Sequence, residues 1–470
     1  MGIPCIRMMQ IAVALTFVFA GIAAADPVAD SNGTMNVLVK SRVPLTTDVI
    51  AAISGHGSRI AYVWPEINAL SLSVAPSKMG DLVADPFVAV VEADQQGSAE
   101  GGDDRATAAG SAPSSTVVPL FTSTTPLLTW NLSMARTTGS GFDGTGVTVA
   151  VVDSGLPQNW TEFLPEGSVD LEHAAGFGAE GWGDFHSPAR AIRGVGGHIG
   201  LFPHGLAVSS LIVGFPSDFG PVGGAAPGAR ILPIRVLNQF NFGWFSWFTA
   251  GILHVARLKA EGALPGPVVI NFSIQASGDS AILKDAIDYA IDQGVVFVTI
   301  AGNFGPDPGS IAFPGRLPES ITAGAVGWVS QFSTPLWFLD TVPADDPGQL
   351  YLAAFSGREF PGDPPASRVD VVAPGSFVFG EWLFGPGFSE GREVAFDAVD
   401  NFIFGTSFAC PHVAGIAAQM LQKNSGLNQT SVESILRGTA LPVPPGSWDA
   451  AGTGRGLARG VVAVAATPAP

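Results

Sequence analysis

The stretch from residue 268 to residue 301, VVINFSIQASGDSAILKDAIDYAIDQGVVFVTIA, decides the fold class of this chain. Its two ends, VVINFSI (268–274) and VVFVTIA (295–301), are apolar runs of strand length. Between them, apolar side chains recur at helical spacing: Ile282, Leu283, Ala286, Ile287, Ala290 and Ile291. Asp279 or Ser280 can cap the start of this helix, and Gly294 can end it. A helix between two fully apolar strands predicts a crossover in a buried parallel sheet.

Similar apolar runs on the N-terminal side extend this unit. VTVAVV (147–152) and ILPIRVL (231–237) have the same continuous apolar character. The sequence therefore predicts an α/β domain over residues 127–470, with a mostly parallel sheet flanked by helices.

The first 25 residues have the pattern of a signal peptide. Arg7 supplies a positive charge, Ile11–Ala20 is apolar, and three small residues, Ala23–Ala25, suit a cleavage site. The alternative is a membrane anchor, but an apolar run of about 15 residues is short for a span. The pattern predicts a secreted protein, extracellular or periplasmic, with no membrane segment after the signal is removed.

Residues 26–96 are predicted to form a small α+β domain. Their apolar residues predict strands and helices in the order β-α-β-β-α-β, which is typical of a ferredoxin-like fold. Residues 97–126 are rich in Gly, Ser, Thr, Ala and Asp and are predicted to be a linker that contains a maturation site. We expect cleavage after Leu120 or Phe121, with an earlier cut near Gln96 as the alternative.

Composition excludes several classes of protein. The 470-residue chain is 47% hydrophobic and 13% charged, with a net charge of −18, and an acidic surface disfavours nucleic acid as a partner. Only two cysteines are present, and Cys5 lies in the expected signal peptide. Cys410 is then left alone, which excludes an intrachain disulfide and a zinc-type cysteine cluster, and a buried space-filling role is favoured over a reactive thiol.

Four polar residues lie where chemistry is expected. Asp153 follows the apolar run 147–152, at the end of a parallel strand where open α/β sheets place their sites. His204 and Ser407 each precede an apolar stretch that is typical of a helix, and Asn303 follows the run 295–301. A serine needs a histidine to take its proton, and the histidine needs a carboxylate to orient it. Asn303 could stabilise the oxyanion that forms.

Each of these residues alone has a structural explanation, since an aspartate, a serine or an asparagine can cap a turn or a helix and a histidine can lie on the surface. The order Asp…His…Ser along the chain changes this assessment. It differs from the orders Ser…Asp…His and His…Asp…Ser of other serine hydrolases. His198 is a competing histidine, but no helical stretch follows it.

The motifs around these residues resemble those of the subtilase family of serine proteases. VTVAVVDSG (147–155) is similar to the family's aspartate motif, HGLAVSSLIVG (204–214) to its histidine motif and GTSFACPHVAGIAA (405–418) to its serine motif. The 26–96 unit resembles the subtilase propeptide. The resemblance implies a secreted preproenzyme that hydrolyses peptide bonds through an acyl-enzyme. It also implies protein or peptide substrates and a propeptide that inhibits its own enzyme until cleaved.

The resemblance also implies a substrate cleft. Its residues would be Ser273, Ile274, Gln275, Gly302, Phe304 and Ala312. The first three offer backbone groups to an extended substrate, which would pair as an added strand. An apolar rim at Phe304 and a floor raised by Ala312 favour apolar substrate side chains on the acyl side of the cut bond. No cofactor is expected to be required, although structural calcium is common in the family and Glu162 is a candidate carboxylate.

The sequence departs from the family pattern in places. Leu206 and Ser210 stand where threonine and glycine are usual in the histidine motif, which keeps open a catalytically inactive binding protein of the same fold. An esterase or amidase would use the same triad. The ranges 158–203, 328–350 and 376–402 are similar to insertions and are expected to form surface loops beside the cleft.

Overall fold

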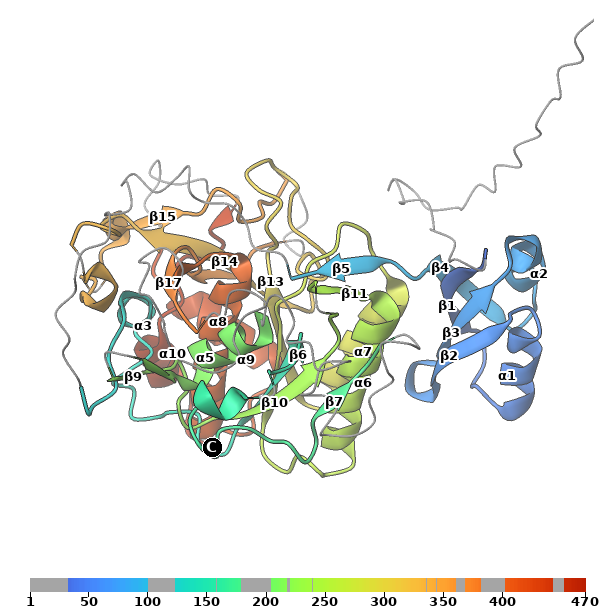
Figure 1. Ribbon diagram of the computed structural model, residues 1–470, viewed down its shortest axis with the longest axis horizontal. Helices are drawn as coiled ribbons and strands as arrows, with labels where there is room; N and C mark the ends of the chain where they lie inside the picture. Colours follow the sequence, from blue (N-terminus) through green and yellow to red (C-terminus); the bar gives the residue numbers. More distant parts are fainter. Residues whose placement is uncertain are drawn as a thin grey trace, which may run out of the picture.

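A computed structural model shows two packed units, a small one near the N-terminus and a larger α/β unit (Figure 1). The residues that the structure describes are 33–99, 123–157, 159–178, 204–217, 220–238, 240–334, 336–343, 345–360, 368–381, 402–442 and 452–470. The expected signal peptide, Leu120, Phe121 and His198 lie outside them.

The larger unit is built on an eight-stranded sheet in the order β15-β14-β13-β12-β6-β10-β7, with β16 paired to β14. Its strands are β6 Thr148–Asp153, β7 Ala175–Gly176, β10 Arg230–Arg235, β12 Val268–Phe272, β13 Val295–Ile300, β14 Ile321–Trp328, β15 Leu350–Leu352 and β16 Val371–Pro374. Every pairing is parallel except that of β14 with β15. The prediction of a mostly parallel sheet is confirmed.

Helices cover both faces of this sheet. They are α3 Trp130–Met134, α5 His204–Val213, α6 Phe245–Ala260, α7 Ala281–Asp292, α8 Thr406–Lys423, α9 Gln429–Thr439 and α10 Gly460–Ala466. Alternate residues of β6 enter different cores: Val149 and Val151 pack with α5 and α8, whereas Ala150 and Val152 pack with α6 and α7. Successive side chains of β6 thus pack against the helices on opposite faces of the sheet, as expected for a buried parallel sheet.

The predicted crossover helix is α7, and Ser280 caps it. The Ser280 hydroxyl accepts a hydrogen bond from the backbone N–H of Leu283 at 3.0 Å, and Gly294 follows the helix with a φ of 83°. Ser280 therefore fills the role for which Asp279 was the alternative.

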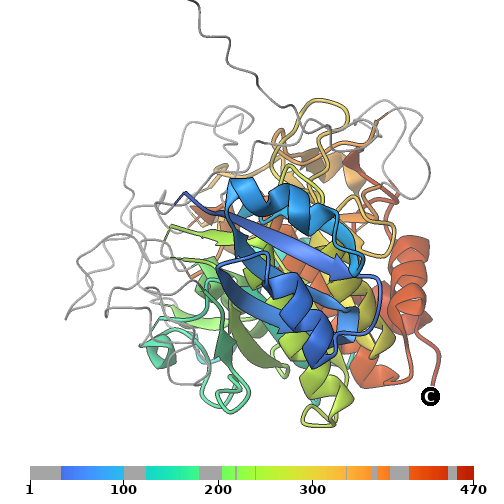
Figure 2. The ribbon, with the colours of Figure 1, turned by 90° about the vertical axis from the view of Figure 1, so that its right-hand side faces the viewer.

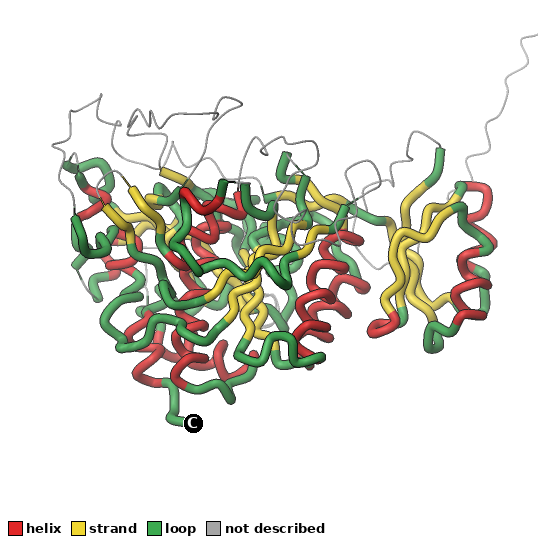
Figure 3. Tube along the Cα trace, turned by 60° about the horizontal axis from the view of Figure 1, so that its bottom comes forward, coloured by secondary structure: helices red, strands yellow, loops and turns green. Residues whose placement is uncertain are grey.

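The small unit has the predicted ferredoxin-like order. Its elements are β1 Met35–Ser41, α1 Thr47–Ser54, β2 Arg59–Trp64, η1 Pro65–Ile67, β3 Ala69–Val74, η2 Pro76–Lys78, α2 Met79–Val83 and β4 Val88–Ala93. The strands form an antiparallel sheet in the order β2-β3-β1-β4, and α1 and α2 cover its outer face. Figures 2 and 3 show this sheet lying against the larger unit, with its own helices turned outward.

The inner face of the small sheet packs on α6 and α7. Leu38, Trp64 and Ile67 belong to the same buried apolar cluster as the residues of those two helices. Ion pairs flank the cluster, since Lys40 bonds Asp285 and Arg257 bonds Glu66. The inner face of the small unit thus belongs to one apolar cluster with α6 and α7.

The chain beyond β4 does not leave the surface at once. Gln96–Ser98 form β5, which pairs antiparallel with β11 (Phe242–Trp244), and Ala99 is buried. The prediction of a linker starting at residue 97 therefore differs from the structure, because residues 97–99 are held by hydrogen bonds to the larger unit. The linker character predicted for the rest of 97–126 lies mostly outside the described residues.

The segment 328–350 is not a surface loop. Its two short helices are η5 Trp337–Leu339 and η6 Pro347–Gln349, and Trp337 and Phe338 are at most 2% exposed. The Trp337 ring lies 6.2 Å from that of Trp130 in α3. This corrects the expectation from sequence, because the aromatic content of the segment forms part of the core.

Most of 158–203 and 376–402 lies outside the described residues. The remaining short elements are η3 Trp160–Glu162, β8 Phe215–Ser217, β9 Gly220–Val222, β17 Val378–Phe379 and β18 Phe402–Ile403. None of the described helices has both the length and the apolar character needed to cross a bilayer.

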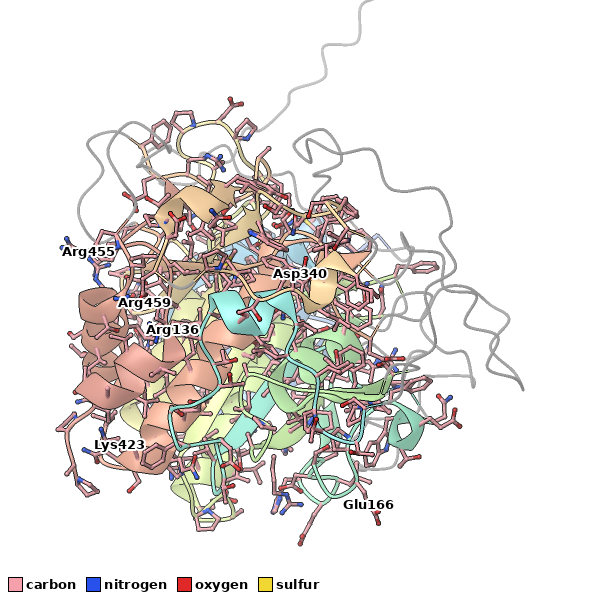
Figure 4. All side chains as sticks on the ribbon, turned by 90° about the vertical axis from the view of Figure 1, so that its left-hand side faces the viewer. Arg136, Glu166, Asp340, Lys423, Arg455 and Arg459 are labelled. Atoms are coloured by element: carbon pink, nitrogen blue, oxygen red, sulfur yellow. The ribbon has the colours of Figure 1, made fainter. Side chains whose placement is uncertain are left out.

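The C-terminal helix is tied to the start of the larger unit by charge. Figure 4 shows Arg136 and Arg459 near each other, and Arg459 directly precedes α10. Both guanidinium groups donate to Asp345, at 2.9 and 2.6 Å. These bonds join three segments that are far apart in the sequence.

Candidate active site

Asp153 and His204 form a buried pair at the carboxyl end of the sheet. Asp153 is the last residue of β6 and His204 is the first residue of α5. Nδ1 of His204 lies 3.0 and 2.9 Å from the two carboxylate oxygens of Asp153, and both residues are at most 1% exposed. A proton on Nδ1 donated to Asp153 leaves Nε2 as the basic nitrogen. The pair has the geometry of a general base and its orienting carboxylate.

Ser407 is the second residue of α8. Gly405 precedes the helix with φ 150° and ψ 153°, a conformation that suits glycine, and it turns the chain into the helix. The Ser407 hydroxyl donates to the backbone oxygen of Ser273 at 3.3 Å. The ring of Phe408, the next residue, lies 5.4 Å from the His204 ring. The histidine and serine motifs, about half the chain apart, therefore meet here.

Asn303 lies on the same helix start. Its side-chain oxygen accepts hydrogen bonds from the backbone N–H of Thr406 at 2.9 Å and from the Thr406 hydroxyl at 2.8 Å. Both donors occupy the oxygen, so the orientation of the amide is fixed and its NH₂ group points away from Thr406. Thr406, which the sequence did not single out, thus positions the expected oxyanion donor beside Ser407.

The predicted substrate-pairing segment, Ser273–Gln275, directly follows β12. Gln275 exchanges both backbone hydrogen bonds with Ser98 at 2.9 Å, and β11 pairs with the other edge of β5. Residues 96–99 of the same chain thus lie as a strand between the two edges, and Figure 1 shows β5 beside β11. The added-strand geometry expected for a substrate is adopted here by the protein's own N-terminal segment.

The other predicted cleft residues gather next to this strand. Ile274 and Ala312 are buried, whereas the side chain of Phe304 is exposed. Gly302 lies against Ala312, because a Cβ at Gly302 would be 2.3 Å from the Ala312 Cβ. The structure therefore brings together the residues that the resemblance implied for the cleft.

The side chain of Gln275 has a contact that the sequence did not reveal. Its oxygen accepts a hydrogen bond from the backbone N–H of Asn303 at 2.6 Å. Gln275 is 6% exposed, so this bond is shielded from water. It connects the strand-pairing segment to the expected oxyanion residue.

Two further candidates have structural surroundings of a different kind. Cys410 is fully buried in α8, and burial raises the pKa of its thiol to about 12, which favours the space-filling role. Glu162 is exposed on η3. Within the part of the chain that the structure describes, no group of three or more His, Cys, Asp or Glu side chains could hold a metal ion. Calcium binding at Glu162 stays a prediction.

A serine at a helix start, next to a residue whose ring lies close to a histidine that a buried aspartate orients, is consistent with serine peptidases and related hydrolases. The family model described as "Subtilase family" matches residues 144–460, well over half of the chain. The chain therefore belongs to the subtilase family, as its motifs implied.

Individual relatives agree with this assignment. Subtilisin of Bacillus sp. (strain TA39) is 28% identical over 312 residues, which cover 65% of this chain and 63% of that protein. Subtilisin E of Bacillus subtilis (strain 168) is 25% identical over 391 residues, covering 83% and 79%. The crystal structure of fervidolysin from Fervidobacterium pennivorans, a keratinolytic enzyme, has a TM-score of 0.64 at 21% identity, covering 93% of this chain and 61% of that one. This last match shows the fold alone, and the chain spans less than two thirds of the first and last of these relatives.

Proposed function

We propose that this chain is a serine endopeptidase that hydrolyses peptide bonds through an acyl-enzyme. The Ser407 hydroxyl attacks the carbonyl carbon, while Nε2 of His204 takes its proton and then gives it to the leaving amine. Asp153 holds the ring and stabilises its charged form. The buried Asp153–His204 pair beside the start of α8 carries this proposal.

The catalytic role of Ser407 can be tested directly. Wild-type protein should react with a fluorophosphonate probe and digest casein, and Ser407→Ala should abolish both, because the change removes the nucleophile with little effect on packing. Near wild-type casein digestion by the alanine variant would contradict the assignment. A wild-type protein that takes no label would favour an inactive binding protein, and label with ester hydrolysis but no casein digestion would favour an esterase.

The substrate is proposed to be an extended peptide with an apolar side chain on the acyl side of the cut. Support comes from the strand pairing at Gln275, the exposed ring of Phe304 and the buried methyl group of Ala312. Analysis of the products from a peptide library tests this preference. Cuts made mainly after Lys or Arg would contradict it.

The N-terminal unit is proposed to be an inhibitory propeptide. Two of its carboxylates cap helices of the larger unit: Glu92 accepts from the backbone N–H groups of Ala281 and Ile282 at 3.1 and 3.3 Å, and Asp94 accepts from that of Ser246 at 2.9 Å. These contacts hold β5 in the cleft, where it would compete with substrate.

The reaction is proposed to need no cofactor, since nucleophile, base and oxyanion donor are all side chains. A stabilising calcium ion near Glu162 would be revealed as a lower melting temperature in a chelator with unchanged initial activity.

Secretion is proposed from the signal-peptide pattern of residues 1–25 and is tested by finding the mature protein outside the cell.

A further inference from the structure

Gly97 is the central and the buried residue of β5. It pairs with Gly243 of β11 on one edge, while Gln275 pairs with the next residue, Ser98, on the other. Gly97 is buried, whereas Gln96 is exposed and Ser98 is half-buried. Of these three positions, only that of Gly97 points into the protein.

Phe248 of α6 fills the space beneath Gly97. A Cβ at Gly97 would be 2.8 Å from Cε2 of Phe248 and 2.9 Å from the backbone oxygen of Gln275. A Cβ at Gly243 would be 2.5 Å from Cε1 of the same ring. Carbon atoms that are not bonded pack at about 3.5–4.0 Å, so no side chain fits at Gly97 unless the ring or the backbone moves.

The ring of Phe248 has little freedom to move. It is 1% exposed and lies between the rings of Phe245, at 6.2 Å, and Phe272, at an edge-on distance of 5.7 Å. Interiors are close-packed, so a shift of this ring would disturb the core that α6 shares with the sheet.

We propose that Phe248 restricts the substrate to glycine at the position that Gly97 occupies. This inference rests on the proposed function, since it assumes that a bound substrate has the position and register of β5. Ser98 faces Gln275 in an antiparallel register. In a substrate bound in the same way, the residue two positions after the one at Ser98 would therefore face Ser273. The carbonyl oxygen of Ser273 accepts a hydrogen bond from the Ser407 hydroxyl, so this residue lies next to the nucleophile. The required glycine therefore lies three positions before the residue that supplies the attacked carbonyl.

Peptide substrates that differ only at this position test the restriction on wild-type enzyme. We expect kcat/KM to fall about 10–100-fold from glycine to alanine, and further for valine or leucine, because overpacking of this size is costly. Alanine at the position of half-buried Ser98 is the matched control and should change little. Equal rates with glycine and leucine would overturn the inference and leave the protease proposal intact, whereas cleavage of no peptide would count against the protease proposal.

A variant assigns the effect to the ring. Phe248→Leu should raise the relative rate for alanine over glycine about tenfold, and Phe248→Ala should raise it further if that variant folds. A folded Phe248→Leu enzyme, verified by its circular dichroism and probe labelling, that keeps the wild-type selectivity would show that Phe248 is not the determinant.

Discussion

Asn303 is held by three hydrogen bonds to two neighbours, Thr406 and Gln275, before any substrate arrives. Its side-chain oxygen accepts hydrogen bonds from the backbone N–H and the hydroxyl of Thr406, and its backbone N–H donates to the side-chain oxygen of Gln275. The amide NH₂ group is thereby preorganised. A preorganised donor stabilises the charge of the transition state most, because it does not have to reorient during the reaction. The sequence predicted the role of Asn303 but not the means by which the amide is oriented.

Asn303→Ala should lower kcat by about 10²–10³-fold with little change in KM, the range measured when subtilisin loses one oxyanion donor. The amide is expected to bond the oxyanion more strongly than the ground-state carbonyl, so the loss belongs to the transition state. Steady-state kinetics on one peptide decide the point. A raised KM at unchanged kcat would assign Asn303 to ground-state binding.

Gln275 is expected to act through Asn303 as a positioning residue. Gln275→Leu keeps the side-chain volume but leaves the backbone N–H of Asn303 buried without its acceptor, which costs about 1–3 kcal/mol. We expect kcat to fall roughly tenfold, with KM changed less. Gln275→Glu retains an acceptor oxygen and is the matched control, which should recover most of the turnover. A loss confined to KM would show that the side chain only contacts substrate.

The residues of the triad could be predicted because each follows or precedes a strongly apolar element, in an informative order. The contacts of Gln275 and Phe248 could not. The Gln275 side chain reaches a residue 28 positions away, and the side-chain direction in an irregular segment has no periodic signal. Gly97 lay in a glycine-rich stretch where composition favours a linker.

At the scale of elements, two helix starts are completed by another part of the chain. The N-terminus of α7 uses its own Ser280 together with Glu92, and the N-terminus of α6 uses Asp94. Carboxylates are favourable there because helix N-termini carry free N–H groups and partial positive charge. Sequence could identify Ser280 from its local position, but a cap supplied from a separate unit leaves no local pattern.

These two carboxyl groups should make the docking of the N-terminal unit depend on pH. Burial raises the pKa of Glu92 to about 7, although bonds from Ser280 and two backbone N–H groups lower it and Asp285 raises it again. Burial likewise raises the pKa of Asp94 to about 6, against the bonds from Ser246. Both groups regain their ordinary values near 4.5 and 3.8 when the units separate.

A pKa that is higher in the docked state means that protonation favours docking. The contribution is complete below the ordinary values and is lost as pH rises through 6 to 7. After self-cleavage, the N-terminal unit should therefore dissociate about tenfold or more faster at pH 8 than at pH 5. Gel filtration of the cleaved complex against pH measures this, and Glu92→Gln should flatten the dependence. Faster dissociation at pH 5 would reverse the sign and refute the argument.

At the scale of the molecule, the two-unit organisation follows from the sequence. The change from a β-α-β-β-α-β pattern to alternating apolar strands and helices predicts both units, because each fold depends on periodicity that is visible locally. The burial of segment 328–350 could not be predicted from the sequence. Its apolar residues have neither helical nor strand period, so their burial against Trp130 depends on tertiary packing alone.

Maturation should cut the chain next to the strand that already lies along Gln275. Composition favoured Leu120 or Phe121, whereas the register of β5 favours an earlier bond. Ser98 faces Gln275, and Ser273, whose carbonyl oxygen accepts a hydrogen bond from the Ser407 hydroxyl, lies two residues before Gln275. In an antiparallel pairing, the bond next to the nucleophile is therefore expected two residues after Ser98. We therefore predict self-cleavage after Glu100, with Gly101 as the first residue of the mature chain. Glu100 is not apolar, but a segment already paired on both edges needs less binding energy from its side chain. N-terminal sequencing of the secreted protein decides the matter, and Ser407→Ala, which should remain uncut, is the control. A mature chain that begins at Phe121 or Thr122 would mean that β5 blocks the cleft without being the segment that is cut.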